Sequence, residues 1–165
     1  MINASLGQTF YYARRYDEAI AQLHKVIEMN ANFALPHRIL GRCYTMKEMY
    51  GEAVAEHQKA VAISNGGSVE LADLAHALAK SGKRSEARKI LDQLIERQKR
   101  EYVDRATLAS LHFALGDKEE ALSNLEKAYE DKSTGLAYIK VNPAYDDEFR
   151  SHPRFQELLR KVGLP

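Results

Sequence analysis

The feature that most constrains this sequence is a self-similarity that returns every 34 residues. One column of the repeat holds alanine in all four copies, at Ala19, Ala53, Ala87 and Ala121. A second column holds leucine and lies 13 residues before each alanine, at Leu6, Leu40, Leu74 and Leu108. Two columns in register over four copies indicate a repeat architecture, in which each unit is stabilised by its neighbours.

The apolar residues within each unit have helical spacing. Leu40 and Tyr44, for example, are four residues apart and therefore lie on one side of a helix. Gly82 and Gly116 fall where one helix ends and the next begins, a position that favours positive φ. We therefore predict four pairs of helices joined by tight turns, at 3–14 and 17–29, 35–47 and 51–63, 68–81 and 84–98, and 104–115 and 118–130.

Small residues occupy a further column on the first helix of each predicted pair. Its members are Gly7, Gly41, Ala75 and Ala109. The side chains at a helix crossing set the separation of the two axes, within about 8–10 Å. We expect these small residues and the alanine column to face one another, so that the two helices of a pair approach closely.

These columns resemble the tetratricopeptide-repeat (TPR) family. The first unit matches the family pattern at Leu6, Gly7, Phe10, Tyr16 and Ala19, with Leu23 in the place of the family's phenylalanine. Later units depart from it, because His57 stands where a large apolar residue belongs and Leu78 and His112 replace an aromatic. The resemblance covers residues 2 to about 133. It implies an all-α, right-handed α-solenoid of about four helical hairpins, whose first helices line a concave groove that binds proteins and performs no enzyme chemistry.

The period ends near residue 133, and residues 134–165 have a different organisation. Residues 136–141 are similar to a truncated fifth first-helix, which Pro143 ends because proline disfavours helix at the residue before it. A last helix is predicted to begin at Ser151 or His152 and to cap the array. The predicted domain organisation is therefore four units and a cap, at about 1–33, 34–67, 68–101, 102–133 and 134–165.

Both ends of the chain suggest a larger assembly. The tail from Lys140 onward is similar to the tails of certain bacterial multidomain regulators, whose TPR arrays follow a winged-helix, protein kinase or cyclase module. That resemblance implies that this chain is the interaction part of a larger protein. At the other end, Ile2, Leu6 and Phe10 leave an apolar surface on the first predicted helix. Either a further helix precedes it, or two chains pair there as a homo-dimer.

The far side of the first helices is the candidate partner-binding surface. A helical wheel places ten candidate residues there: Gln8, Tyr11, Tyr12, Arg38, Arg42, Met46, Asp73, His76, Lys80 and Phe113. Thr45 and Ser110 share this side. Arg38 and Arg42 are four residues apart and can together receive a carboxylate, and the alternative is an ordinary solvated pair. The aromatic residues and Met46 add the contact area that recognition surfaces favour.

Comparison with the TPR family excludes one class of partner. TPR domains that grip the acidic C-terminus of heat-shock chaperones use lysine, asparagine and arginine at five groove positions. In this sequence the corresponding positions are Ala4, Gln8, Ile39, Val69 and Asp73. That clamp is missing, so we expect a protein or peptide partner of a different kind.

Composition argues against several other functions. The chain has 24 basic and 23 acidic residues, without the basic surplus that nucleic-acid binding requires. Cys43 is the only cysteine and is expected to be a small buried residue, and no two histidines are three or four residues apart as metal ligands on one helix would be. No apolar run reaches the ~20 residues of a membrane span. We expect a cytoplasmic protein without a cofactor, and expect Asp146, Asp147 and Glu148 to form a solvated turn.

Overall fold

The computed structural model describes residues 4–164, so Ile2 and the first residue of the first predicted helix, Asn3, lie outside the described residues. Within this range the chain forms helices and no strand, in agreement with the predicted all-α class. Every helix of the repeats begins and ends within two residues of its predicted bounds. They are α1 (Ala4–Tyr12), α2 (Tyr16–Met29), α3 (Ala34–Met46), α4 (Tyr50–Ile63), α5 (Ser68–Lys80), α6 (Arg84–Arg97), α7 (Arg105–Ala114) and α8 (Lys118–Glu130).

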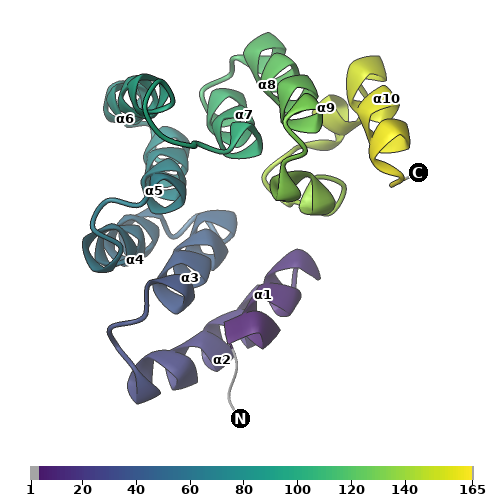
Figure 1. Ribbon diagram of the computed structural model, residues 1–165. Coiled ribbons are helices and arrows are strands. Elements are labelled where there is room, and N and C mark those ends of the chain that lie inside the picture. The colour runs from purple at the N-terminus through teal and green to yellow at the C-terminus, as the bar shows by residue number, and fades with distance from the viewer. Residues whose placement is uncertain (1–3, 165) are drawn as a thin grey trace.

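The helices pack in consecutive pairs along a curved path (Figure 1). Within the curve, α1, α3, α5 and α7 pack one against the next and form an inner layer. The helices α2, α4, α6 and α8 form the outer layer, and α2 and α4 also pack against the first helix of the following pair. The first helices therefore present a continuous concave surface, as the resemblance implied.

Close helix crossings explain the two columns of small residues. The alanines of the first column are fully buried in all four units. A Cβ added to Gly7 would lie 2.6 Å from the side chain of Leu23, and one added to Gly41 would lie 2.7 Å from the ring of His57. Real Cβ atoms do not approach other atoms so closely, so an alanine at either position would force Leu23 or His57 to shift. The predicted steric role of the column is confirmed.

The turn inside each hairpin repeats with the same period. Arg14, Glu48, Gly82 and Gly116 are 34 residues apart, and all four have positive φ, between 60° and 86°. In each turn the amide of the next residue donates to a carbonyl five residues back, which is the hydrogen bond of a Schellman motif. Gly82 and Gly116 have positive φ as predicted. The first two units form the same turn with Arg14 and Glu48, although positive φ is unfavourable for residues other than glycine.

The chain after α8 differs from the predicted truncated helix at 136–141. A short 3₁₀ helix, η1 (Thr134–Tyr138), is followed by an irregular segment and by an unpredicted helix, α9 (Asp147–Ser151). The irregular segment is held by Arg150, whose guanidinium donates three hydrogen bonds to carbonyl groups, those of Lys140, Asn142 and Tyr145. These contacts hold the chain from Lys140 to Tyr145 in a non-helical path, and the apolar spacing of residues 136–141 does not report them.

The predicted solvated turn at 146–148 is instead the start of α9. Asp146 accepts a hydrogen bond from the amide of Phe149 and caps the helix, and the next two acidic residues favour its first turn. The final helix, α10 (Pro153–Val162), begins where it was predicted, because His152 accepts from the amide of Arg154.

An aromatic cluster joins this tail to the last repeat. Phe113 of α7 contacts Tyr145 and Phe149, with ring centroids 5.3 Å and 4.7 Å apart. Phe155 of α10 packs on the same two tail rings and is fully buried. The apolar residues of α10 thereby cover the exposed end of the array.

The repeated turn gives a first prediction. Gly82→Ala should destabilise the protein by about 1–2 kcal/mol, because an L-residue is strained at the φ of 86° and no atom lies within 4 Å of the added Cβ. Gly51→Ala, also free of neighbours but inside α4, should stabilise it by about 0.5 kcal/mol. Urea denaturation of the two variants measures both effects. Equal effects of the two substitutions would contradict the role of the turn.

Candidate functional site

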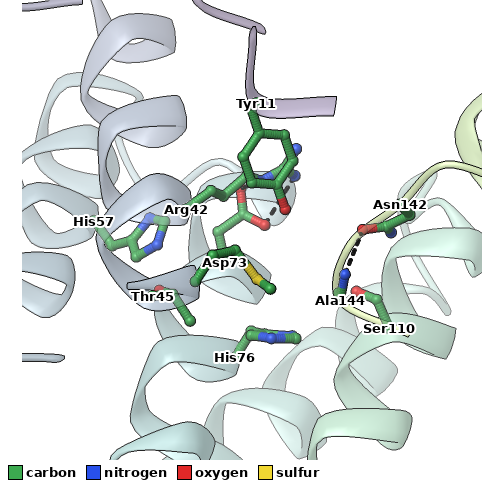
Figure 2. Close-up of a pocket in the computed structure, with 10 residues that line it drawn as sticks. Tyr11, Arg42, Thr45, His57, Asp73, His76, Ser110, Asn142 and Ala144 are labelled. Carbon is green, nitrogen blue, oxygen red and sulfur yellow. Dashed lines mark hydrogen bonds and ion pairs between the residues drawn. The ribbon is translucent and has the colours of Figure 1, made fainter. Parts of the chain in front are cut away.

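A small polar pocket lies on the inner side of the array, and we call it the inner pocket. It has a volume of about 40 Å³. Figure 2 shows its lining residues converging from the first helices, from α4 and from the tail. They are Tyr11, Arg42, Thr45, Met46, His57, Asp73, His76, Ser110, Asn142 and Ala144.

An ion pair between two units forms one wall of the inner pocket. Arg42 of α3 binds Asp73 of α5 through two hydrogen bonds of 2.8 Å and 2.9 Å. Burial would raise the pKa of Asp73, but the guanidiniums of Arg42 and Arg38 outweigh it and hold that pKa below its ordinary value. The carboxylate that these arginines were predicted to receive is therefore supplied by the chain itself.

Arg38 occupies a looser position beside the same carboxylate. Its Nε lies 3.9 Å from Glu70 and 4.0 Å from Asp73, beyond hydrogen-bonding distance, and has no hydrogen-bond partner. Burial and the neighbouring Arg42 lower its pKa. Arg38 thus adds positive charge to this wall while Arg42 makes the directional contacts.

Two histidines line the inner pocket in their neutral form. His57 is 1% exposed, and its Nδ1 has no hydrogen-bond partner. Burial lowers the pKa of His57 from 6.5 to about 4 and does the same to the partly buried His76. Near neutral pH both rings are uncharged. The pocket therefore offers hydrogen-bonding groups around an internally neutralised ion pair.

The tail closes the inner side of the array. Tyr138 at the end of η1 stacks on Tyr12 of the first unit, with ring centroids 4.8 Å apart and planes 4° from parallel. Further along the tail, Asn142 and Ala144 line the inner pocket opposite Tyr11, and the Asn142 side chain accepts from the Ala144 amide (Figure 2). The first and last parts of the chain thus meet across the concave surface.

A larger opening adjoins the inner pocket, and we call it the cationic cleft. It has a volume of about 420 Å³ and shares Met46 and Ala144 with the inner pocket. Its basic lining residues are Arg14, Lys80, Arg84 and Lys118. Apolar and acidic lining residues include Met46, Phe113, Tyr145, Asp146 and Asp147. A volume of this size is typical of ligand sites.

The predicted candidate residues divide among these features. Five line the inner pocket, namely Tyr11, Arg42, Met46, Asp73 and His76. Met46, Lys80 and Phe113 line the cationic cleft. Tyr12 stacks on the tail and Arg38 lies behind the ion pair, whereas Gln8 is partly exposed and lines neither opening.

Sequence reasoning missed several lining residues. His57 had a visible signal, because it replaces a large apolar residue in the repeat, but that signal did not show that it reaches the inner side. The sequence carried no such signal for Asn142, Ala144 and Tyr145, since the tail lies outside the period. Arg14 lies in a hairpin turn and Arg84 begins the helix after one, so neither was on the helix face that the wheel selected.

Comparison with known proteins agrees with this architecture. The family model of the tetratricopeptide repeat matches residues 5–68 and 72–137. The chain belongs to the tetratricopeptide-repeat family. The TPR resemblance seen in the sequence is thereby confirmed, as is the helical solenoid. No curated protein matches the chain.

A solved TPR structure shows the same fold. The chain is similar to YrrB, a TPR protein with an unusual peptide-binding site, at 21% identity and a TM-score of 0.52. The alignment covers 96% of this chain and 81% of that one. At this level of identity the likeness concerns the fold alone.

Residues 4–164 of this TPR chain contain neither of two other kinds of site. No helix there is long and apolar enough to cross a membrane. Within the same range, no group of three or more His, Cys, Asp or Glu side chains is arranged to hold a metal ion. Cys43 is fully buried, as predicted, and burial raises the pKa of its thiol to about 12.

The buried histidine gives a second prediction. The unfolded chain binds a proton at His57 near pH 6.5 and the folded chain only near pH 4, so stability falls as pH drops through this window. His57 should contribute a loss of about 2 kcal/mol between pH 7 and pH 5. His57→Leu should remove that contribution, because Leu23 already packs against a glycine at the equivalent crossing.

Urea denaturation of wild type and His57→Leu at both pH values measures the difference. His76 contributes with the same sign, so the variant should keep part of the acid sensitivity. An equal loss of stability in the two proteins would show that His57 does not titrate in this way.

Proposed function

We propose that this TPR protein is an interaction scaffold that binds a peptide or a partner domain on its concave surface. The observation that carries the proposal is the junction of the inner pocket with the cationic cleft at Met46 and Ala144. Side chains from all four units and from the tail surround this junction. A segment bound there would contact the whole array.

The chemistry of the surface supports binding and not catalysis. In the inner pocket the charged groups Arg42 and Asp73 are committed to each other, and the Cys43 thiol is buried and protonated. The TPR family is a protein-interaction fold, and the similar YrrB protein has a peptide-binding site. The resemblance of the tail to bacterial multidomain regulators supports a role as the interaction part of a larger regulator.

Peptide selection tests the proposal directly. Peptides selected from a random display library against the wild-type chain should lose about tenfold in affinity when Met46 is replaced by alanine, since truncated interface anchors cost at least ~1 kcal/mol. Met29→Ala is the matched control, because Met29 lies on the outer helix α2 and is 69% exposed. Calorimetric titration measures both, after circular dichroism has shown that the variants are folded.

Two outcomes would contradict the proposal that the concave surface is the binding site. One is a set of selected peptides that bind Met46→Ala as tightly as the wild type. The other is a set whose binding is weakened by Met29→Ala instead.

Homo-oligomerisation is the alternative function, and it rests on a separate observation. Leu6 of α1 is 44% exposed, although its column is fully or nearly fully buried at Leu40 and Leu108. If two chains pair through this face, the mass from light scattering should rise toward that of a dimer with concentration. Leu6→Glu should then restore the monomer, because it places a charge in an apolar contact. A wild type that stays monomeric over the whole range removes this alternative.

A further inference from the structure

The cationic cleft has two walls of opposite composition. The wall formed by the repeats carries Arg14, Lys80, Arg84 and Lys118 and no carboxylate. The wall formed by the tail carries the two acidic residues of the cleft, Asp146 and Asp147.

Most of the positive charge on the repeat wall is not neutralised within the chain. Lys118 forms an ion pair with Glu148 at 2.9 Å. Arg84 donates to the carbonyl of Leu115, which leaves its charge in place. Among residues 4–164, no ion pair is formed by the other three cations of this wall, Arg14, Lys80 and Arg84. Elsewhere on the inner side the opposite holds, since Arg42 is fully engaged by Asp73.

The three unpaired cations come from different parts of the array. Arg14 belongs to the turn after α1, Lys80 ends α5, and Arg84 begins α6. Their side chains nevertheless line one cleft, in which Met46, Phe113 and Tyr145 supply apolar surface. Cations around apolar surface in a concave site favour a ligand in which carboxylates alternate with apolar side chains.

We propose that the cationic cleft docks an acidic segment of a partner protein, with carboxylates along the repeat wall and an apolar side chain directed toward Met46. This inference rests on the proposed function and specifies the chemistry of the ligand. The site uses none of the five chain positions that correspond to the chaperone clamp, which are Ala4, Gln8, Ile39, Val69 and Asp73. The partner is thus recognised through the hairpin turns and helix ends.

The carboxylates of the tail wall have a defined part in this arrangement. Asp146 is occupied as the cap of α9, through its hydrogen bond with the amide of Phe149. Asp147 lines the cleft at the first position of that helix. An acidic ligand is therefore repelled from the tail wall and directed to the repeat wall, so substitutions on the two walls have opposite effects.

The test uses two capped, fluorescein-labelled peptides, one built of Glu-Glu-Leu triplets and the other of Lys-Lys-Leu triplets. Fluorescence anisotropy should show binding of the acidic peptide to the wild-type chain and none of the basic one. Arg14→Glu/Lys80→Glu should weaken binding of the acidic peptide about tenfold, as expected for reversal of two partly exposed charges. Asp147→Asn should tighten it about twofold, and added salt should weaken it.

The matched control is Lys25→Glu/Lys89→Glu, which changes the net charge equally on the outer helices α2 and α6. Both lysines are exposed, and neither lines the cleft. If the control variant weakens binding of the acidic peptide equally, the effect comes from net charge and the proposal is overturned. The proposal is also overturned if the wild-type chain binds both peptides equally, or binds neither.

The library peptides used to test the proposed function separate the two ideas. If the library peptides bind at Met46 and the acidic peptide does not bind, the proposal of an acidic partner is wrong, and the proposed scaffold function is retained. If neither set of peptides binds, both proposals fail. A third outcome is that the chain dimerises on light scattering and that the acidic peptide prevents this dimerisation. It would identify a second copy of this chain as the occupant of the cleft, contrary to the proposal.

Discussion

The whole array depends on how closely the two helices of each hairpin can cross. At the second crossing the backbone of Gly41 lies against the ring of His57, and even a methyl group would overlap that ring. At the first, Gly7 lies against Leu23 in the same way. A wider crossing would separate the inner and outer layers and expose the buried alanines. The third and fourth units have Ala75 and Ala109 at the equivalent positions, both fully buried, so a small residue is kept at every crossing.

A bidentate ion pair is added to this repeated packing on the inner side of the array. Arg42 and Asp73 join the second unit to the third, and breaking such a pair typically costs about 3–5 kcal/mol, because the remaining charge is left poorly solvated. The pair also removes from the concave surface the arginine that is best placed to bind an external carboxylate. Among residues 4–164, Arg14 and Lys80 near the hairpin turns form no such ion pair, so under the proposed mode of binding they are the cations left for an external carboxylate.

The parts of the structure that the sequence predicts are those that depend on near neighbours. Helix bounds follow from apolar spacing within about a dozen residues, and the left-handed turn at Gly82 follows from a single residue type. The tail depends on contacts that follow no period. Arg150 holds carbonyl groups as far back as Lys140, and Tyr138 stacks on Tyr12 from the opposite end of the chain. Neither contact leaves a periodic signal, so the inner pocket could be only half predicted.

That same tail changes what kind of site the concave surface is. An open solenoid offers a groove that a ligand can enter anywhere along its length. Here the Tyr12–Tyr138 stack joins the two ends, and Asn142 covers the inner pocket, so the accessible part of the surface is bounded by the chain itself. The aromatic cluster that fixes Tyr145 keeps this boundary in place, because its rings are buried between the last repeat and α10. If the proposed function holds, a ligand meets the inner pocket and the cationic cleft as one bounded site, and the repeats form the frame around it.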